Sequence, residues 1–445
     1  MGGLFGTDGI RGITNQDPIT REMGIKLGRS LVRFCNRRDI DPNIVIGRDT
    51  RASGKILEYA LVSGVISAGG NVNLIGVIPT PGVAYLIREL GGGAGIVLSA
   101  SHNPPEYNGF KVFSNEGFKL SEVEESEIEA MIFEEPGSLP KGDFGQVEVP
   151  HNARNRYISF LMETIPEQLK DMRIIIDCAN GATFRVAPEL FEMIGLDVEV
   201  MFAEPDGQNI NMKCGSQHTE TLSKRVIEKE ADLGLAFDGD GDRLIAVDEK
   251  GEALTGDQIL TICAKMLHER GKLNNNIVVS TIMSNMGLRS ALKGFGIGHI
   301  TTHVGDRYVM EEIRRQNSSL GGEESGHIIF SDHHTTGDGI LTALQLLYAI
   351  RTFNQPLSDL SALMTIYPQT LVNVPVKRKP DIYSVPELAG VINDTETELG
   401  DEGRVLVRYS GTEPMCRVMV EGKDQEEIEE YARRIADVVT KRLDS

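Results

Sequence analysis

The sequence predicts an α/β protein in which three similar α/β domains with mixed sheets precede a smaller C-terminal α+β domain. The first supporting observation is a pattern of strand, small-residue loop, helix and strand that occurs three times, with more than 100 residues from one start to the next. The second is that each copy is followed by a strand, a polar loop and another strand. The C-terminal stretch that remains has a shorter and different pattern.

Apolar runs bounded by small or polar residues place the elements of each βαβ unit. The first unit has strands at 43–47 and 71–78, separated by a loop at 48–53 and a helix at 54–68. The second and third units repeat this order, with strands and helices at 173–177, 184–194, 197–202, 276–280, 287–295 and 297–303.

The two strands after each unit enclose a loop of unusual composition. A buried strand at 95–98 leads into the loop 99–111, where Asn108-Gly109 predicts a hairpin turn before an extended run at 110–113. The corresponding loops of the second and third domains are 238–243 and 322–327. Because similar domains carry chemically different loops at equivalent places, we expect one site where the three domains meet.

Stretches rich in proline, glycine or charge mark the domain boundaries. They lie at 136–142, 249–252 and 367–380, and they predict domains over 1–150, 151–251, 252–366 and 367–445. In the last domain, strands at 404–409 and 417–420 enclose a fourth loop at 410–414, and an amphipathic helix follows at 425–443.

The composition is that of a globular protein, with 40% hydrophobic and 25% charged residues in a chain of 445. No apolar run could span a bilayer and the N-terminus has no signal-peptide pattern, so we expect no membrane partner. The net charge of −20 disfavours nucleic acid as a partner. Five dispersed cysteines without a Cys-x-x-Cys spacing indicate reduced thiols and a cytoplasmic protein.

The first loop holds a candidate nucleophile. Ser101 follows a buried strand, beside the imidazole of His102 and within reach of Lys111, which is the placement of a hydroxyl used in covalent catalysis. Taken alone, the sequence Ser-His-Asn-Pro fits a strand cap equally well. The other loops decide between these interpretations.

The second loop is a candidate metal site. Asp238, Asp240 and Asp242 alternate with glycines and precede Arg243. Carboxylates so close together are unfavourable without a cation, and oxygen ligands alone favour a hard divalent ion such as Mg²⁺. With Glu249 they also fit several EF-hand positions, but Arg243 stands where that loop requires glycine and strands flank it. A structural acidic turn is the other alternative.

The serine and the carboxylates together favour phosphoryl transfer over acyl transfer. A phosphate on Ser101 would find a metal ion with open coordination positions, and Arg243 would be a second positive contact. The Gly-x-Ser-x-Gly sequence of many acyl-transfer enzymes does not occur in the chain.

The third loop suits a sugar. Glu323 and Ser325 offer hydrogen-bond partners for sugar hydroxyls and His327 ends the loop, although a solvated turn would have a similar composition. Just upstream, we expect a polar turn at 305–307, and His303 is either a proton carrier or a structural histidine at a strand end.

Two further stretches suit an anion. The fourth loop combines hydroxyls and a glycine backbone with guanidinium groups; its candidate ligands for a dianionic phosphate are Arg408, Ser410, Gly411, Thr412 and Arg417. Near the N-terminus, Arg11 stands among glycines within 5–12, which allows the close approach of a second anionic group.

The four loops resemble those of the α-D-phosphohexomutase superfamily over essentially the whole chain. Ser-His-Asn-Pro, Asp-Gly-Asp-Gly-Asp-Arg, Gly-Glu-x-Ser-Gly-His and Ser-Gly-Thr-Glu-Pro occur in the expected order. The phosphoglucosamine mutase branch is the most similar, because of the segments 5–12, 206–211, 214–218, 335–339, 410–414 and 417–422. Two residues depart from the family pattern: Ser99, where Thr is commoner, and Glu324, where Gln or Met is usual.

The resemblance implies a heart-shaped arrangement of four domains around one cleft and a phosphoserine mechanism. Phospho-Ser101 would give its phosphoryl group to glucosamine 6-phosphate, which makes a 1,6-bisphosphate. This intermediate would reorient, Ser101 would take the other phosphoryl group back, and glucosamine 1-phosphate would leave for UDP-N-acetylglucosamine synthesis. Glucosamine 1,6-bisphosphate or glucose 1,6-bisphosphate would be the activator. A homodimer is suggested by analogy alone.

The same resemblance implies the role of each site residue. Mg²⁺ would be held by Ser101 and the three aspartates, and His102 and Lys111 would be the acid/base candidates. Arg243 would be a further catalytic residue. The hexosamine phosphate would be bound by the remaining residues, namely Arg11, Glu323, Ser325, His327, Arg408, Ser410, Gly411, Thr412 and Arg417.

Three alternatives remain open from the sequence. The first is a phosphoglucomutase or phosphomannomutase with the same mechanism. The others are a Mg²⁺-dependent sugar phosphatase, which would need a water site, and a non-catalytic sugar-phosphate sensor, which would not need Ser101 and the aspartates. Because water would hydrolyse a phosphoserine, we also expect the last domain to close over the substrate about a hinge at 367–380.

Overall fold

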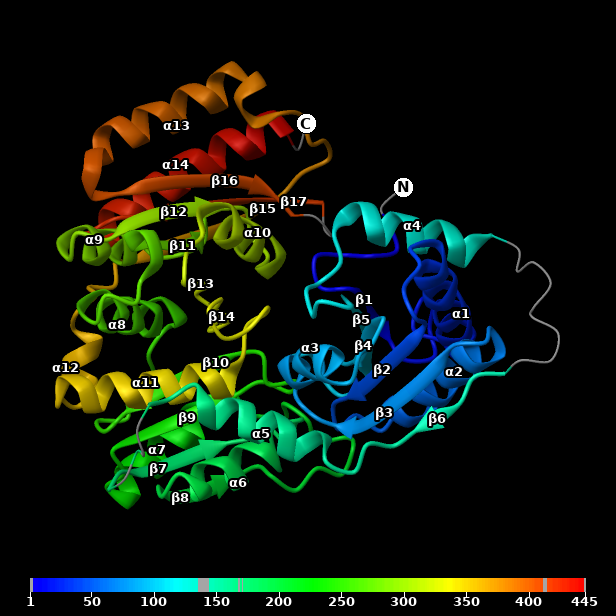
Figure 1. Cartoon of the computed structure of the whole chain (residues 1–445). Helices are drawn as coiled ribbons and strands as arrows, with labels where there is room; N and C mark the ends of the chain where they lie inside the picture. The colour runs from blue at the N-terminus through cyan, green and yellow to red at the C-terminus, as the bar shows by residue number, and fades with distance from the viewer. Residues whose placement is uncertain (1–2, 135–143, 167–168, 170, 411–413, 444–445) are drawn as a thin grey trace. The chain divides into compact units, whose positions relative to one another are not determined.

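A six-stranded mixed sheet organises the first segment, with the strand order β1-β5-β4-β2-β3-β6. The computed structural model describes residues 3–134, 144–166, 169, 171–410 and 414–443 (Figure 1). The first segment contains β1 (Ile10–Ile13), α1 (Arg21–Arg37), β2 (Asn43–Arg48), α2 (Gly54–Ser67), β3 (Asn71–Val77), α3 (Thr80–Glu89), β4 (Ala94–Leu98), β5 (Tyr107–Ser114), α4 (Glu122–Phe133) and β6 (Val147–Glu148).

Alternating side chains of this sheet face two helical layers, with α1 and α2 on one side and α3 on the other (Figure 1). On the first side, Ile46 of β2 belongs to one buried cluster with Leu27 of α1. On the other side, α3 comes so close that a Cβ on Gly47 would lie 2.5 Å from Val83. The sheet is therefore buried on both faces, and its polar loops lie at the strand ends.

The second and third segments build four-stranded sheets, with the orders β10-β9-β7-β8 and β12-β11-β13-β14. In each sheet three strands are parallel and the last turns back as an antiparallel hairpin. The second segment has α5 (Ala153–Glu163), β7 (Arg173–Asp177), α6 (Val186–Met193), β8 (Asp197–Met201), α7 (Glu220–Lys229), β9 (Leu233–Phe237) and β10 (Leu244–Asp248).

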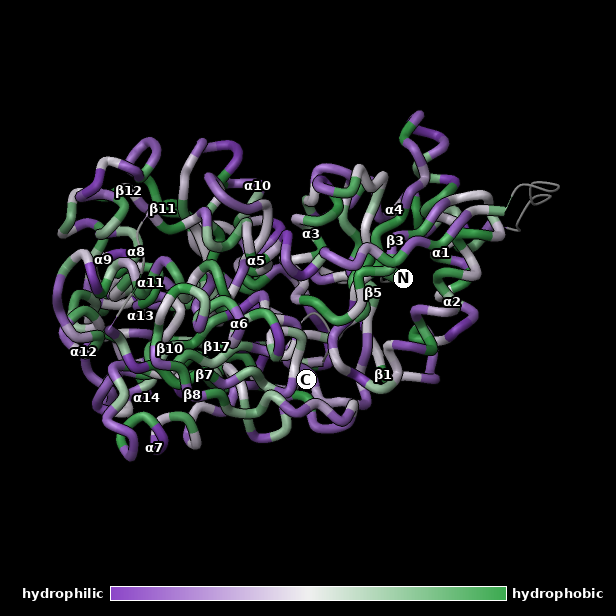
Figure 2. Tube along the Cα trace, turned by 60° about the horizontal axis from the view of Figure 1, so that its bottom comes forward, coloured by the Kyte–Doolittle hydropathy of each residue, from purple (hydrophilic) through white to green (hydrophobic). Residues whose placement is uncertain are grey.

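The third segment follows the same order and ends in two helices. It has α8 (Gly256–Glu269), β11 (Ile277–Thr281), α9 (Met286–Gly294), β12 (Gly298–Thr302), α10 (Asp306–Gln316), β13 (Leu320–Gly322), β14 (Ile328–Phe330), α11 (Gly339–Phe353) and α12 (Leu357–Ser361). In all three segments the loop of interest joins the hairpin strands, and Figure 2 shows hydrophobic colour along much of these strands.

The C-terminal segment has a three-stranded antiparallel sheet of order β15-β17-β16. Its elements are β15 (Gln369–Pro375), α13 (Pro386–Leu399), β16 (Arg404–Tyr409), β17 (Met415–Glu421) and α14 (Gln425–Leu443). Leu388 and Ile392 of α13 share a buried cluster with Ile435 of α14 and Val418 of β17. The predicted fold class, three α/β parts with mixed sheets and a smaller α+β part, is confirmed.

The chain divides into two compact units. The first comprises Met1–Ser284 and Leu292–Leu363, and the second comprises Asn285–Ala291 and Met364–Ser445. The short segment 285–291 is joined to the second unit, because Asn285 Nδ2 donates to Tyr367 O at 2.9 Å and Met286 N donates to Glu421 Oε1 at 2.7 Å. Among the described residues, no helix is both long and apolar enough to cross a membrane.

The predicted turn at Asn108-Gly109 is wrong. Both residues lie inside β5, which is paired on both sides with β1 and β4. A Cβ on Gly109 would lie 2.6 Å from Ser99 O and 2.7 Å from Ile10 O. The glycine is needed for close strand approach, and the chain turns earlier, where Asn103 N donates to Ala100 O and Tyr107 N to Pro104 O.

Two other local predictions are also corrected. The expected polar turn at 305–307 is the start of α10, with Gly305 as its N-cap residue and Asp306 and Arg307 buried. Within the expected hinge at 367–380, Gln369–Pro375 is strand β15, paired along its length with β17. A strand that belongs to a sheet cannot serve as a flexible connection.

Candidate active site

Ser101 lies directly beyond the end of β4, fully buried, with a φ of 50°. Its hydroxyl donates to Asp238 Oδ2 at 2.6 Å, and Nδ1 of His102 lies 3.4 Å from Ser101 Oγ. The hydrogen bond joins the first segment to the second across 137 residues of sequence. The predicted nucleophile and the predicted metal loop are thus in direct contact.

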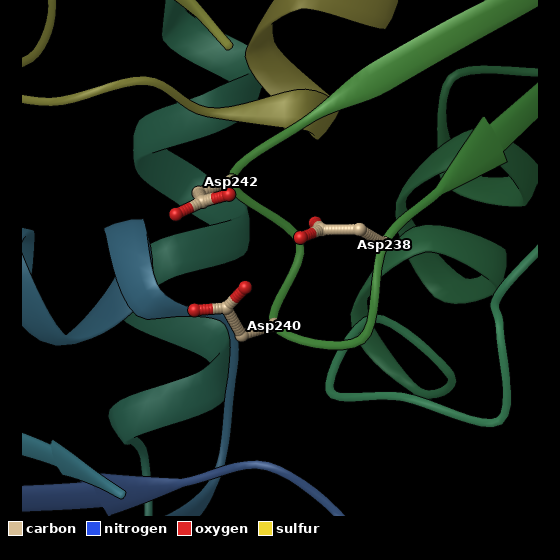
Figure 3. A group of neighbouring side chains, drawn as sticks. All are labelled: Asp238, Asp240 and Asp242. Carbon is tan, nitrogen blue, oxygen red and sulfur yellow. The ribbon is translucent and has the colours of Figure 1, made fainter. Parts of the chain in front are cut away.

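Asp238, Asp240 and Asp242 turn their carboxylates toward one another from the loop between β9 and β10 (Figure 3). One oxygen of each lies within 4.8 Å of the others, and all three residues are buried. Among the described residues, Asp240 Oδ1 and Asp242 Oδ1 have no hydrogen-bond partner. Buried carboxylate oxygens without a donor fit a cation, so these residues match the donor set that Mg²⁺ requires.

The electrostatics of the three carboxylates support this. Burial and the charges of Asp242 and Asp240 raise the pKa of Asp238 well above its usual range. Burial acts in the same direction on Asp240 and Asp242, but their positive and hydrogen-bonding partners together lower the pKa of both. These partners are Lys111 with Thr80 for Asp240, and Lys111 with His327 and Arg243 for Asp242. The three adjacent carboxylates therefore require a further positive charge in addition to that of Lys111.

Lys111 is almost fully buried in β5, at 1% exposure, among carboxylates. Its Nζ lies 2.7 Å from Asp240 Oδ2, 3.1 Å from Asp242 Oδ2 and 3.2 Å from Asp8 Oδ2. Burial lowers the pKa of Lys111, but the carboxylates outweigh burial and raise it overall. This environment favours a permanent positive charge over proton exchange.

Two arginines and a histidine flank the serine. Arg243 Nε lies 3.8 Å from Asp242 Oδ1, and Arg11 donates to Asn103 Oδ1 at 3.4 Å and pairs with Asp8. Burial, assisted by the charges of Arg243 and Arg11, lowers the pKa of His102 to about 4. The imidazole is therefore neutral at neutral pH.

The loop between β13 and β14 brings His327 to the same carboxylates. His327 Nδ1 lies 3.7 Å from Asp242 Oδ1, and Gly337 N donates to its Nε2 at 3.1 Å. Glu323 Oε1 accepts from Gly305 N at 3.1 Å, and Ser325 Oγ is buried without a partner among the described residues. His303, the other candidate on this segment, is exposed and lies edge-on to Tyr308.

The phosphate-binding candidates of the second unit are described with that unit alone. Arg408 of β16 pairs directly with Arg417 of β17. Burial and the charge of Arg417 lower the pKa of Arg408. Like charges directly opposite each other on a sheet are unfavourable, so the pair suits an anion. Ser410 is buried and bonds from its N–H to Met415 O at 2.9 Å; Gly411 and Thr412 lie outside the described residues.

Four family models together match most of the chain. They are the phosphoglucomutase/phosphomannomutase α/β/α domains I, II and III, at 2–137, 155–251 and 255–367, and the C-terminal domain of the same family, at 371–438. A curated phosphoglucosamine mutase from Syntrophus aciditrophicus is 54% identical over 448 residues, which is 100% of both chains. One from Staphylococcus aureus is 47% identical over 100% of this chain and 99% of that one.

The chain belongs to the phosphoglucosamine mutase family.

Solved structures agree with this fold at lower identity. A phosphoglucomutase/phosphomannomutase family protein from Burkholderia thailandensis has a TM-score of 0.82, with 24% identity over 98% of each chain. An Aspergillus fumigatus N-acetylphosphoglucosamine mutase, solved with GlcNAc-6P and magnesium, has a TM-score of 0.63, with 19% identity over 81% of this chain and 92% of that one.

Segments that resemble the phosphoglucosamine mutases surround the site. Asn211, from the segment 206–211, donates to Ser101 O at 2.8 Å. Asp338, from the segment 335–339, caps α11 and accepts from Tyr157 Oη at 2.7 Å. A Cβ on Gly337 would lie 2.4 Å from His327 Nε2, so this glycine lets the main chain pack on the imidazole. These segments contact the loops that hold the candidate active-site residues.

Sequence reasoning missed a chain of buried ion pairs beside the site. Lys119 Nζ lies 2.5 Å from Asp8 Oδ1 and 2.5 Å from Asp306 Oδ2, and Asp306 Oδ2 lies 3.4 Å from His327 Nε2. The two partners of Lys119 are 111 residues or more from it along the chain, so no local pattern joins them. The only available signal was the position of Asp8 in the same glycine-rich stretch as Arg11.

Proposed function

We propose that this chain interconverts glucosamine 6-phosphate and glucosamine 1-phosphate through a phosphoserine at Ser101. The observation that carries the proposal is the contact between Ser101 Oγ and Asp238, at 2.6 Å, at the edge of three buried carboxylates. The curated relatives of the family, at 47–54% identity over their full length, support the amino sugar as substrate.

The reaction consists of two phosphoryl transfers. In the first, the bond between Ser101 Oγ and phosphorus breaks, the 1-hydroxyl of glucosamine 6-phosphate takes the phosphoryl group and gives its proton to a nearby base, and Ser101 Oγ takes up a proton. In the second, the 1,6-bisphosphate has reoriented, the bond between the 6-oxygen and phosphorus breaks, and Ser101 Oγ takes the 6-phosphoryl group and gives up its proton. The 6-oxygen takes up a proton, and glucosamine 1-phosphate leaves. An unphosphorylated chain is primed by glucosamine 1,6-bisphosphate or glucose 1,6-bisphosphate.

Asp238, Asp240, Asp242 and the phosphate on Ser101 are the ligands proposed for Mg²⁺. A bound Mg²⁺ ion would neutralise the charge of the transferring phosphoryl group. Lys111 adds a fixed positive charge next to these carboxylates, at 2.7 Å from Asp240 Oδ2. Arg243 and Arg11, which flank the serine, would contact the phosphate oxygens.

Proton transfer is assigned to His102. A neutral imidazole 3.4 Å from Ser101 Oγ can accept the proton of an incoming hydroxyl. We do not assign this step to Lys111, whose carboxylate partners keep it charged. We assign His327, which lies between Asp242 and Gly337, to the substrate-binding residues.

The rest of the substrate is assigned to two loops. Glu323 and Ser325 would bind sugar hydroxyls, and the unpartnered Ser325 Oγ supports this role. The distal phosphate would be bound by residues of the second unit: Arg408, Ser410, Gly411, Thr412 and Arg417.

Kinetics with competing substrates test the reaction. We expect kcat/KM for glucosamine 6-phosphate to exceed that for glucose 1-phosphate and mannose 1-phosphate by at least tenfold, about 1.4 kcal/mol in the transition state. Mass spectrometry should find one phosphoryl group on Ser101, lost in Ser101→Ala together with activity. A preference for glucose or mannose phosphates would indicate a phosphoglucomutase or phosphomannomutase instead. Release of inorganic phosphate at the rate of turnover would indicate a phosphatase.

We also propose that the chain is a cytoplasmic homodimer. Ile56 and Tyr59 on α2 are 59% and 65% exposed, and apolar residues on the outer face of a helix suit a subunit interface. The five cysteines are all free and buried, as expected in a reducing compartment. Sedimentation analysis should give a dimer that Ile56→Glu converts to a monomer.

A further inference from the structure

The backbone of Ser101 is held in an unfavourable conformation. Its φ of 50° lies in the left-handed region, which is unfavourable for a residue with a Cβ. Such a conformation persists only where the surrounding structure enforces it, and it is most frequent at functional sites. The residues that enforce it here come from the loop after β2, from the end of β4 and from the second segment.

Arg51 provides most of this support. At 1% exposure it is the largest fully buried side chain among the described residues. Its Nη2 donates to Ser101 O at 3.0 Å and Asn103 O at 2.8 Å, and its Nη1 donates to Tyr107 O at 2.9 Å and to Pro104 O. Its Nε donates to Asp49 Oδ2 at 2.8 Å. A guanidinium has five N–H donors, and here each of the five has an acceptor.

Asp49 and Ser99 connect this arginine to the amide of the nucleophile. Asp49 Oδ2 accepts from Ser99 Oγ at 2.6 Å, and Ser99 Oγ accepts from Ser101 N at 2.9 Å. Asp49 and Ser99 are 0% exposed. From the second segment, Asn211 Nδ2 donates to Ser101 O at 2.8 Å and Asn103 O at 3.0 Å. Both backbone polar groups of Ser101 are therefore bonded to buried side chains.

We propose that Arg51, Asp49, Ser99 and Asn211 are positioning residues that orient the Ser101 hydroxyl for phosphoryl transfer. A buried arginine–carboxylate pair is a poor source of stability, because the loss of hydration offsets the attraction of the charges. Its five matched hydrogen bonds instead specify one path for the loop. The inference rests on the proposed role of Ser101 as the phosphoryl carrier.

The hydroxyl at position 99 makes the inference testable with conservative variants. Ser99→Thr keeps the hydroxyl that accepts from Ser101 N, and threonine is the residue commoner in the superfamily pattern. Ser99→Ala removes it and leaves a buried amide without an acceptor. Arg51→Lys keeps the charge but has three donors in place of five. Arg48→Lys is the control, because Arg48 lies in the same stretch, pairs with Glu58 at 3.0 Å and contacts Asp49 only at its main-chain oxygen, at 3.3 Å.

The experiment measures kcat and KM for glucosamine 6-phosphate and the rate at which glucose 1,6-bisphosphate phosphorylates Ser101, followed by intact mass. Misplacement of a reacting group by about 1 Å costs about 100-fold in rate. We therefore expect Ser99→Ala and Arg51→Lys to lower kcat and the phosphorylation rate by about 10- to 100-fold. We expect KM to change less than about threefold, because other residues bind the sugar and the distal phosphate. Ser99→Thr and Arg48→Lys should keep wild-type values.

The outcomes separate this inference from the proposed function. The inference is overturned, while the proposed function stands, if Ser101 of the Ser99→Ala variant is phosphorylated as fast as in the wild type. The same holds if Ser99→Thr lowers kcat and the phosphorylation rate as much as Ser99→Ala does. A change in KM alone would also overturn it. If Arg51→Lys does not fold, as judged by circular dichroism, the two Ser99 variants still decide. If the wild-type Ser101 never takes a phosphoryl group, the proposed function fails, and the inference with it.

Discussion

At the scale of single residues, Lys111 shows how burial changes the meaning of a charge. A lysine on a loop near a serine suggests a proton donor, but here β5 carries it into a cluster of three carboxylates within 3.2 Å of its Nζ. The same side chain then serves as a structural cation. Its removal should affect stability as well as activity.

We predict that Lys111→Met destabilises the first unit by about 3–5 kcal/mol, because it leaves buried carboxylates without their counter-charge. Urea unfolding in the presence of EDTA measures this, and added Mg²⁺ should recover part of the loss. Lys55→Met, at an exposed position on α2, is the matched control and should change stability by less than about 0.5 kcal/mol. Equal effects of the two substitutions would contradict the assigned role of Lys111.

Asp177 at the end of β7 should make stability depend on pH. Burial raises its pKa to about 7, even though Ala179 N and Gly215 N both donate to the carboxylate at 2.8 Å. Because the folded pKa is above the unfolded one, near 3.9, the native state binds the extra proton. Asp177 therefore contributes at most about 4 kcal/mol to the free energy of unfolding. This contribution is fully present below pH 4 and is lost as the pH rises to 7.

The variant Asp177→Asn carries no titrating group at this position and should lack that part of the pH dependence. We expect it to be less stable than the wild type at every pH, since its amide N–H₂ faces a backbone donor. The difference in stability between the wild type and Asp177→Asn should become smaller from pH 5 to pH 8, because only the wild type loses stability over this range. Urea midpoints at both pH values measure this, and parallel profiles would contradict the assignment.

At the scale of elements, the metal loop and the serine loop fit together through a glycine. A Cβ on Gly239 would lie 2.6 Å from Ser101 O and 2.7 Å from Asn211 Nδ2. Gly239 is therefore required for the contact between two loops from different segments. The residue type follows from tertiary packing.

We predict that Gly239→Ala separates these loops and lowers kcat by about 100-fold, without unfolding the sheet that carries them. Steady-state kinetics and thermal unfolding should be compared with those of Gly294→Ala. A Cβ on Gly294, at the end of α9, meets nothing within 4 Å, so this control should be neutral or slightly stabilising. Normal kinetics for Gly239→Ala would show that the loops tolerate a wider spacing.

The elements also show where local patterns suffice. Strands at 173–177 and 404–409 are found with the predicted bounds, because apolar runs between polar loops leave few alternatives. The turn predicted at Asn108-Gly109 was wrong because the same dipeptide occurs both in tight turns and where three strands approach closely. Only the neighbouring strands distinguish the two, and β1 lies nearly 100 residues away in sequence.

At the scale of the whole molecule, the chain passes between its two compact units at 284–285, 291–292 and 363–364. The predicted domain boundaries at 150, 251 and 366 stay predictions. The expectation that the C-terminal domain closes over substrate can be restated with the observed elements, since β15 is part of a sheet and is excluded as a hinge.

We predict that substrate changes amide hydrogen exchange in residues 363–368 and not within β15. The amides of β15 that face β17 are held in the antiparallel ladder from Gln369 to Pro375, so opening them would require disruption of the sheet. Exchange measured by mass spectrometry with and without glucosamine 1-phosphate tests this. Faster or slower exchange confined to β15 would contradict it, and no change in either segment would argue against closure.

Residues close together in the chain are enough to predict the three α/β parts, the smaller C-terminal part and the chemistry of the loops. Ser101, the three aspartates and Arg243 stand out as local patterns with a chemical meaning. The side chains that neutralise them are known from the folded structure alone. The pairs of Lys111 with Asp240 and of Lys119 with Asp8 span more than 100 residues, and the role of Arg51 depends on a loop 50 residues further on. Burial turns these distant neighbours into the partners that hold the site.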